Sequence, residues 1–313
     1  MRISAHRPPG SMVVAITGGT GLIGRRVASL LEARGMMVRV LSRNESAQFH
    51  WNPDKAQITG GALEGVDAIV HLAGESVAGR WTDEKKRRII ESRRSTTEFL
   101  AREVQKARIR PVIVCASAIG FYGDRGDAWL TETATSGSGF LAETTVAWEA
   151  ALERLSDVSS RLVILRIGVV LAADGGALPQ MAAPIKLGIG SALGSGQQFV
   201  SWIHINDLAR LICVAIDKTL DKSAIITQDL SGIYNAVTPL SVTNAELLQG
   251  IAAALGKPFF LPRVPALVLR MVLGQMSEMV LDSTRVDATK VSSTGFAFQH
   301  SQLSTALADL LGN

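Results

Sequence analysis

The stretch VVAITGGTGLIGRRVASLLEARG, residues 13–35, is the most informative part of the chain for the fold. Residues 13–16 form a short apolar run, which predicts a strand buried on both faces. Residues 22–34 carry apolar side chains on one side and end before Gly35, which predicts a helix. The turn between them places glycines at positions 18, 21 and 24, in the spacing G-x-x-G-x-x-G. Strand, glycine turn and helix in this order predict the start of a βαβ unit.

Each glycine of this turn has a physical role in binding a diphosphate. Gly18 permits the tight turn after the strand, Gly21 brings bare backbone against the diphosphate, and Gly24 lets the helix pack closely. Exposed N–H groups and the positive end of the helix then attract the anion. A purely structural turn is the alternative, but the strand before it and the helix after it favour dinucleotide binding. The predicted binding residues are Gly18, Thr20, Gly21, Leu22, Ile23 and Gly24.

The end of the second predicted strand, residues 37–41, indicates which dinucleotide binds. An acidic residue there would accept hydrogen bonds from the ribose hydroxyls and repel a 2′-phosphate. This chain has Ser42 and Arg43 instead, and a guanidinium pairs well with a phosphate. We therefore expect Ser42 and Arg43 to bind the 2′-phosphate, with NADP(H) preferred over NAD(H).

Strands and helices continue to alternate up to residue 167, after which the pattern changes and the predicted elements lie farther apart. Further strands are predicted at residues 67–72, 111–116, 162–167, 200–205 and 233–237, and further helices at residues 83–108, 141–155 and 206–217. This order predicts an α/β fold, a Rossmann-type doubly wound parallel sheet with a smaller, mostly helical C-terminal substrate lobe. The predicted division is a tail or leader at 1–11, an NADP-binding domain at 12–167 plus about 200–237, and a substrate lobe at about 168–199 plus 238–313.

Composition excludes several classes of protein. With 313 residues, 47% of them hydrophobic, the chain is long and apolar enough for a folded core and is not a disordered protein. Its net charge of +4 is spread along the chain, so no nucleic-acid partner is expected. Cys115 and Cys213 lie in apolar surroundings, which favours free thiols in a reducing compartment.

Membrane and targeting signals are weak. No apolar stretch reaches the roughly 20 residues of a membrane span. Residues 1–11 lack the apolar core of a secretory signal; a native tail, a transit-peptide remnant and an expression leader are the alternatives. We expect a cytoplasmic protein, or one of an organelle interior if the tail is a transit remnant. The sequence does not give the oligomeric state and is compatible with a homodimer.

Several motifs together resemble a known family. The quoted stretches are TGGTGLIG (17–24), VHLAGESVAGRW (70–81), SAIGFYGDRGDAWLTE (117–132), FLAETTVAWEAA (140–151), LRIGVVLAADGGALPQM (165–181), LGSGQQFVSWIHINDLARL (193–211), YNAVTPLSVTNAEL (234–247) and GFAFQH (295–300). From Met12 onward the chain resembles the atypical extended short-chain dehydrogenases/reductases described as epimerase family proteins. Some bacterial members are labelled cell-division inhibitors. The resemblance implies a Rossmann domain with a substrate lobe, NAD(P) binding, and a small-molecule substrate that is largely undefined.

The resemblance also implies roles for individual residues. Leu72, Ala73 and Gly74 match backbone beside the adenosine and diphosphate. Ser117 matches a hydroxyl facing the reacting carbon. Ile167 and Gly168 match positions near the nicotinamide amide.

The Tyr-x-x-x-Lys pair of ordinary members of this class is missing. Its positions are occupied by Leu141 and Thr145, neither of which does acid–base chemistry at neutral pH. Tyr122 is the nearest phenol in sequence to Ser117, so these two are the catalytic candidates, with a pocket wall as the alternative role for Tyr122. Glu75, Arg80, Trp202 and His204 are substrate-pocket candidates, with a structural ion pair and a structural histidine as the alternatives. No cluster has metal-ligand spacing, so no metal site is expected.

Two functions remain open at this point. One is an NADP(H)-dependent oxidoreductase or epimerase-type enzyme acting on an unknown small polar substrate without the usual Tyr–Lys pair. The other is a non-catalytic NADPH-binding sensor or regulatory protein. The glycine turn favours both equally. The missing Tyr and Lys favour the second, whereas a full substrate lobe with polar groups near the sheet edge favours the first.

Overall fold

An eight-stranded sheet forms the base of the molecule. The computed structural model describes residues 11–220 and 226–312, so of the predicted tail only Ser11 is described. The strands lie in the order β12-β8-β6-β5-β1-β2-β3-β4, and all neighbours are parallel except β3 and β4. Their bounds are β1 (Val13–Thr17), β2 (Met37–Ser42), β3 (Phe49–Asn52), β4 (Gln57–Ile58), β5 (Ala68–His71), β6 (Val112–Ala118), β8 (Arg161–Ile167) and β12 (Gly232–Ala236).

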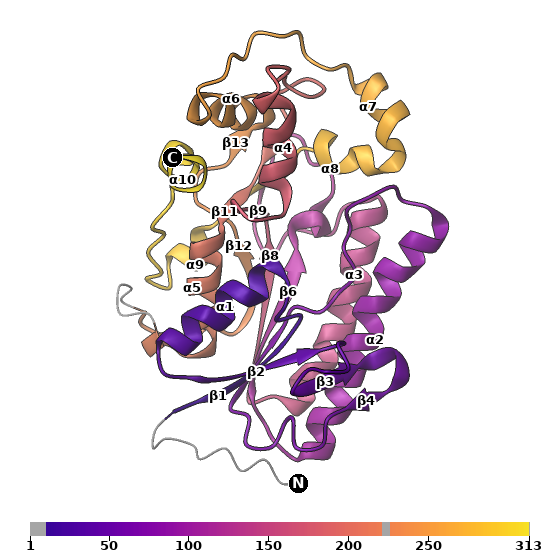
Figure 1. Cartoon of the computed structure of the whole chain (residues 1–313), viewed down its shortest axis with the longest axis vertical. Coiled ribbons are helices and arrows are strands. Elements are labelled where there is room, and N and C mark those ends of the chain that lie inside the picture. Colours follow the sequence, from indigo (N-terminus) through magenta and orange to yellow (C-terminus); the bar gives the residue numbers. More distant parts are fainter. Residues whose placement is uncertain (1–10, 221–225, 313) are drawn as a thin grey trace.

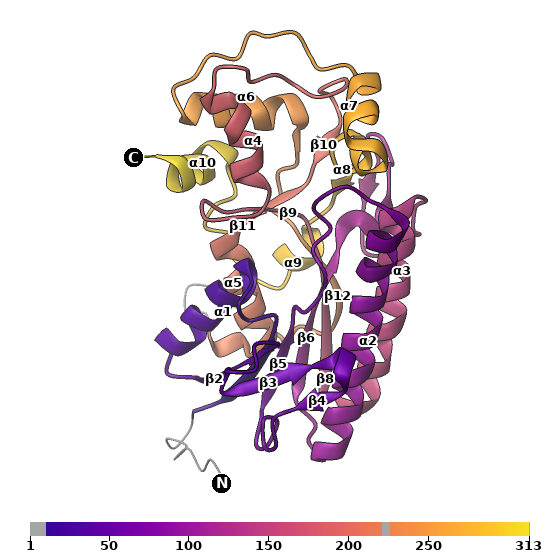
Figure 2. The same cartoon turned by 45° about the vertical axis from the view of Figure 1, so that its right-hand side comes forward.

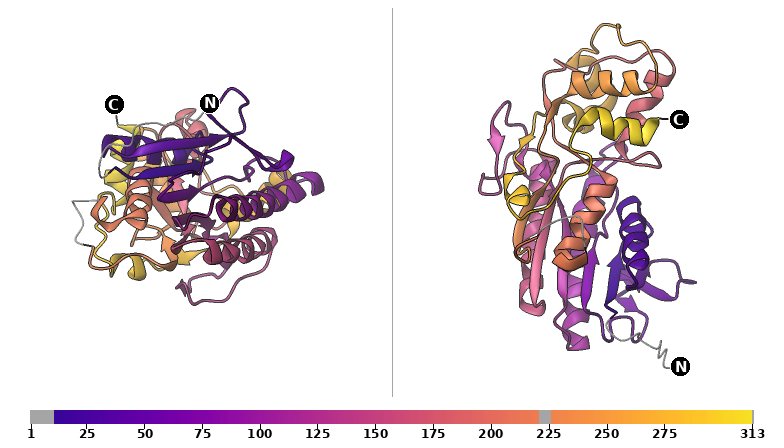
Figure 3. Two further views of the ribbon diagram at one scale, coloured as in Figure 1. Left: turned by 90° about the horizontal axis from the view of Figure 1, so that it is seen from below. Right: turned by 90° about the vertical axis from the view of Figure 1, so that its left-hand side faces the viewer.

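Two pairs of long helices cover the faces of this sheet. Helices α1 (Leu22–Ala33) and α5 (Ile205–Ile216) pack on one face, and α2 (Asp83–Ala107) and α3 (Phe140–Leu152) on the other (Figures 1 and 3). Because both faces are covered, the central strands are mostly apolar, and all five residues of β1 are buried. The long helix α2 begins where the Thr82 side chain accepts a hydrogen bond from the backbone N–H of Lys85.

A smaller lobe stands beyond the carboxyl edge of the sheet (Figure 2). Its apolar core is built from the helices α4, α6 and α10 and from the strands β9 and β11, whose bounds are given next. Outside the main sheet and its four covering helices, the α-helices are α4 (Ala177–Lys186), α6 (Asn244–Ala254), α7 (Ala266–Leu273), α8 (Glu278–Leu281), α9 (Thr289–Ser292) and α10 (Leu303–Leu311). Three pairs of short strands lie there too: β7 (Trp129–Leu130) with β14 (Arg285–Val286), β9 (Val169–Leu171) with β11 (Trp202–His204), and β10 (Phe199–Val200) with β13 (Val242–Thr243).

The predicted Rossmann-type α/β fold is confirmed, with differences in detail. The single strand expected at residues 200–205 is instead two short strands, β10 and β11, which pair outside the main sheet. Ser201 separates them, and its hydroxyl donates to the backbone oxygen of Thr284. The strands β3 and β4 were not predicted. After the smaller lobe begins, the chain returns to the helix layer at α5 and to the main sheet at β12. The division into two domains at the predicted boundaries stays a prediction.

The parallel strands bring the predicted functional residues to one edge. Thr17 at the end of β1 lies beside Leu41 of β2 and His71 of β5, and His71 lies beside Cys115 of β6. In open α/β sheets this carboxyl edge is where ligands bind. No helix among the described residues is both long and apolar enough to cross a bilayer.

Candidate functional site

The glycine turn at the end of β1 has the geometry that its sequence predicts. Gly18 adopts φ +71°, and its carbonyl accepts a hydrogen bond from the N–H of Gly21 at 3.0 Å. A Cβ at Gly24 would lie 2.4 Å from the carbonyl oxygen of Gly18, so α1 approaches the turn as closely as only glycine allows. Gly21 caps α1 without a side-chain hydrogen bond, so the first N–H groups of the helix need another partner. The turn thus offers backbone donors to an anion.

A buried series of hydrogen bonds next to this turn joins β1, β5 and α2. The Thr17 hydroxyl lies 2.7 Å from His71 Nδ1, and His71 Nε2 lies 3.2 Å from the Thr97 hydroxyl. That hydroxyl donates to the carbonyl of Arg93 at 2.7 Å, so it accepts from His71 Nε2–H, and His71 is a neutral ring with its proton on Nε2. Burial lowers the pKa of His71 to about 4, which keeps the ring neutral.

A cavity of about 260 Å³ opens beside the turn. Of the residues predicted to bind the cofactor, eight line it: Gly18, Thr20, Gly21, Ser42, Arg43, Leu72, Ala73 and Gly74. Leu22, Ile23 and Gly24 do not line it; the Leu22 side chain lies instead near Gly175, where an added Cβ would be 3.4 Å away. The glycine turn and the ends of β2 and β5 therefore meet at one cavity.

Part of the cavity wall was not predicted from the sequence. Trp51 and Pro53 with Asp54 come from β3 and the 3₁₀ helix η1 (Pro53–Lys55), and Ser92 and Thr96 come from α2. The tetrapeptide of β3 is too short for its alternation to be recognised, so its place beside β2 was not foreseen.

Charges at the cavity are of both signs. Arg43 is exposed and has no hydrogen bond or ion pair with the described residues, so its guanidinium is available to a ligand. Glu75, a predicted substrate-pocket residue, also lines the cavity, and Lys85 Nζ donates to its carboxylate at 2.6 Å. This hydrogen bond lowers the pKa of Glu75. Arg80 is exposed and does not line the cavity.

The two predicted catalytic residues lie in a buried polar network and not along the cavity. Tyr122 is 0% exposed; its hydroxyl donates to Asn235 Oδ1 at 2.7 Å and accepts from Arg166 Nη1 at 3.0 Å. Ser117 is 3% exposed, and its hydroxyl donates to Glu149 Oε1 at 2.5 Å. Both hydroxyls thus have protein partners, and burial raises the pKa of Tyr122. This packing gives the predicted catalytic roles no support.

The positions of the missing Tyr–Lys pair do lie at the carboxyl end of β6. A Cβ at Gly120, in the turn after β6, would lie 3.2 Å from Leu141 Cβ and 3.7 Å from the Thr145 hydroxyl. The Thr145 hydroxyl donates to the carbonyl of Leu141 at 2.7 Å. This first part of α3 therefore presents an aliphatic side chain and an internally bonded hydroxyl, which cannot act as general acid or base.

The other predicted positions around β8 and β11 are packed in the interior. Ile167 is 8% exposed, and a Cβ at Gly168 would lie 2.6 Å from the carbonyl oxygen of Ser201. Trp202 belongs to the apolar core of the smaller lobe and is completely buried. None of these residues lines the cavity, so the expected substrate-pocket role of Trp202 has no support here.

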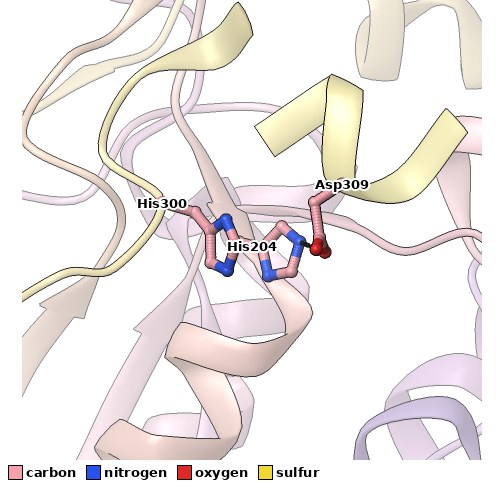
Figure 4. Close-up of side chains that lie close together, drawn as sticks. All are labelled: His204, His300 and Asp309. Atoms are coloured by element: carbon pink, nitrogen blue, oxygen red, sulfur yellow. Dashed lines mark ion pairs between the residues drawn. The ribbon is translucent and has the colours of Figure 1, made fainter. Parts of the chain in front are cut away.

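His204, the last substrate-pocket candidate, holds two parts of the chain together. Its Nδ1 accepts the N–H of Asn206 at 3.1 Å and caps α5. Its Nε2 lies 3.2 Å from Asp309 Oδ2, and its ring stacks on His300 with 3.8 Å between centroids (Figure 4). Burial and the neighbouring His300 lower the pKa of His204 to about 4.

These three side chains do not have the chemistry of a metal site, although their ligand atoms lie within 4.8 Å of one another. Because His204 Nδ1 accepts a backbone N–H, the proton of the neutral ring is on Nε2. That nitrogen therefore has no lone pair for a cation while α5 stays capped. The ring fits a structural role, the alternative to a role in the substrate pocket.

Comparisons with known proteins match nearly the whole chain. Residues 14–227 match the model of the NAD dependent epimerase/dehydratase family, and residues 264–310 match a domain of unknown function, DUF1731. "Epimerase family protein SDR39U1" of Mus musculus is 34% identical over 307 residues, covering 96% of this chain and 100% of that protein. "Epimerase family protein YfhF" of Bacillus subtilis is 34% identical over 310 residues, covering 96% of this chain and 99% of that protein.

Solved structures agree. The human SDR39U1 structure with NADPH superposes with a TM-score of 0.86 at 34% identity and covers 96% of this chain and 100% of that one. A Thermus thermophilus UDP-glucose 4-epimerase complex with NAD, at 18% identity and a TM-score of 0.72, covers 96% and 99% and shares the fold. The chain belongs to the NAD-dependent epimerase/dehydratase family.

Proposed function

We propose that this protein binds NADP(H), with the diphosphate at the glycine turn and the 2′-phosphate at Arg43 and Ser42. The observation that carries the proposal is the cavity at the end of β2, where Arg43 lies exposed with no protein partner among the described residues. β2 ends in Ser42 and is followed by Arg43, so no carboxylate occupies the place where one would repel a 2′-phosphate. The human relative whose structure contains NADPH supports the same choice.

Calorimetric titration tests the cofactor choice. A charged hydrogen bond to phosphate contributes about 1.5–3 kcal/mol, so Arg43→Ala should weaken NADP(H) binding by about 10- to 100-fold and leave NAD(H) binding nearly unchanged. Arg26→Ala is the matched control, because Arg26 Nε donates to Asn206 at 2.7 Å and Arg26 does not line the cavity. Equal or tighter binding of NAD(H) by the wild type would overturn the proposal.

For the reaction, we propose an oxidoreductase or epimerase-type enzyme that acts on a small polar substrate without the usual Tyr–Lys pair. Leu141 and Thr145 supply no acid or base, so the proton must come from another group. Ser117 and Tyr122 stay the predicted candidates, although their burial does not favour them. If Tyr122 is the donor, Tyr122→Phe should lower turnover by at least about 100-fold.

A non-catalytic NADPH sensor is the second candidate, and the same absence of acid–base groups at Leu141 and Thr145 favours it. An assay of NADPH oxidation separates the two. The purified protein is offered a panel of carbonyl compounds, and the loss of the reduced nicotinamide is followed by its absorbance at about 340 nm. Turnover with any member of the panel supports the enzyme. Tight NADPH binding without turnover, and without a small molecule that co-purifies, supports the sensor.

A further inference from the structure

The end of the smaller lobe farthest from the main sheet carries a group of exposed apolar side chains, here called the apolar end. Its six most exposed members are Leu187 and Ile189 after α4, Phe260 between α6 and α7, and Leu267, Met271 and Val272 on α7. Each of them is at least 58% exposed. Figures 1 and 2 show α7 and the connection before it at this end of the molecule. Single exposed apolar side chains are normal, whereas a group of them marks an interaction surface.

Hydrogen bonds join the segments that carry these side chains. The N–H of Val264 donates to the carbonyl of Ala192, and the N–H of Gly194 donates to the carbonyl of Val264, both at 2.9 Å. Arg263 Nη1 also donates to the carbonyl of Ser195 at 2.6 Å. Helix α7 follows this joined stretch directly in the chain. The apolar side chains therefore belong to one part of the lobe and not to separate loops.

The sequence of α7 is unusual for a helix at a protein surface. Seven of its eight residues, ALVLRMVL, are apolar, but only Leu269 is buried. A helix in contact with water normally has polar side chains on its outer face, and one that is apolar all round is normally covered. Leu267 and Met271, four residues apart on one side of α7, are 66% and 72% exposed. The outer face of α7 is thus the kind of surface that another apolar phase covers.

The charged side chains at the apolar end are all positive. Four cations of these segments are exposed: Lys186, Lys257, Arg263 and Arg270. None of them forms an ion pair with a carboxylate of the described residues. Residues 175–206 and 247–277 contain no Asp or Glu. The carboxylate of Glu246, just before the second of these ranges, already accepts the backbone N–H of Thr243 in the capping box of α6.

We propose that the apolar end docks on an anionic lipid surface, with its apolar side chains among the headgroups and its four cations at the lipid phosphates. Apolar side chains next to Lys and Arg are the combination that holds a protein at such a surface. A second copy of this chain fits less well, because a two-fold contact would place the same four cations of both copies against each other. None of these residues lines the cofactor cavity, so the docking is independent of the proposed NADP(H) site.

Co-sedimentation with lipid vesicles tests the docking. Wild-type protein should bind vesicles of phosphatidylcholine with about 30% phosphatidylglycerol at least about 10-fold more tightly than vesicles of phosphatidylcholine alone, and added salt should reduce this difference. Met271→Ser with Val272→Ser should weaken binding to the anionic vesicles by about 10- to 100-fold, because both variants remove apolar surface. Lys257→Gln with Arg270→Gln should weaken it by about 25-fold, since each cation at an anionic surface contributes about fivefold.

Matched controls come from the helices that cover the main sheet. Val146→Ser removes an apolar side chain of α3 that is 41% exposed, and Arg87→Gln removes an exposed cation of α2. Neither control should change binding to either type of vesicle. Circular dichroism melts establish that each variant is folded at the temperature of the assay.

Several results would overturn the proposal. They are wild-type protein that binds neither type of vesicle, equal binding to both compositions, and binding that the substitutions at Met271 and Val272 leave unchanged. A wild-type dimer in light scattering that dissociates in the Met271→Ser, Val272→Ser variant would also overturn it, because a second copy would then cover the apolar end.

Discussion

Acid should destabilise this protein through His71, the buried histidine under the glycine turn. The ring is 0% exposed and neutral, and protonation would place a charge between the Thr17 and Thr97 hydroxyls. In the unfolded chain the imidazole has its ordinary pKa of 6.5, whereas burial lowers the pKa to about 4 in the fold. The unfolded state therefore binds the proton first, and stability is lost as the pH falls from about 6.5 toward 4.

The size of this effect follows from the two pKa values. The full difference corresponds to about 3 kcal/mol, of which about 2 kcal/mol should be lost between pH 7 and pH 5. His71→Gln removes the titrating group. Its free energy of unfolding at pH 7 should be about 1–2 kcal/mol lower because a buried hydrogen bond is lost, but it should depend less on pH by about 2 kcal/mol over the same interval.

Urea titrations at a series of pH values measure both quantities. His50→Gln is the matched control, because it replaces a partly buried histidine of β3 and keeps His71, so the loss attributed to His71 should remain. Parallel curves for wild type and His71→Gln between pH 7 and pH 5 would refute the argument. Such a result would mean that the fold relaxes around a protonated His71, or that the Thr17 and Thr97 contacts do not depend on the neutral ring.

Four other substitutions give separate tests. Gly21→Val should abolish NADPH binding in calorimetry with only a modest loss of Tm, because a Cβ there meets one backbone oxygen at 3.2 Å. Gly24→Ala should instead lower the free energy of unfolding by at least ~1 kcal/mol, because its Cβ would lie 2.4 Å from a backbone oxygen. Tyr122→Phe should lower that free energy by about 1–3 kcal/mol in urea titrations, because it leaves a buried amide oxygen unpaired; an unchanged midpoint would contradict this. Asp282→Asn should raise Tm at pH 8 but not at pH 4, because burial and neighbouring carboxylates raise the pKa of Asp282 to about 6; a rise at both pH values would point to another cause.

The sheet and the cofactor turn could be predicted because their signals are local in sequence. A run such as residues 13–16 is apolar because β1 is covered on both faces, and the glycines at 18, 21 and 24 are needed by the backbone itself. The parallel arrangement then brings Ser42 and Arg43 to the same cavity as the turn without further information. The predicted fold, which depends on such backbone requirements, is confirmed, whereas the binding roles of Ser42 and Arg43 stay predictions.

The side on which a strand residue points could not be predicted. The resemblance to the extended short-chain dehydrogenases/reductases implied that Ser117 faces the reacting carbon. Side chains alternate along a strand, and the register pairs Ser117 with Arg166 of β8, so its hydroxyl meets Glu149 of α3 in the interior. Sequence spacing locates the end of a strand but does not give the side of the sheet to which its last residues point.

Contacts between segments far apart in the sequence explain the other differences between the predicted and the observed site. The cavity wall at Trp51 depends on β3 returning beside β2, and the place of His204 depends on α10 reaching back to it through Asp309. Neither contact leaves a pattern in nearby sequence. Both are set by how distant segments pack, and so they emerge only from the structure.

Two arginines that approach α3 show why proximity to a site does not by itself indicate a role in it. Arg166 donates from Nε and Nη2 to the two Glu149 oxygens at 2.9 and 2.8 Å, and from Nη1 to the Tyr122 hydroxyl. All three of its nitrogens therefore have protein partners, and a ligand would have to displace one of them at the cost of a buried, unpaired carboxylate. Arg93 has one nitrogen bound to carbonyl oxygens and two without partners among the described residues. Arg166 therefore contributes to the stability of the fold, whereas Arg93 keeps two nitrogens without protein partners among the described residues.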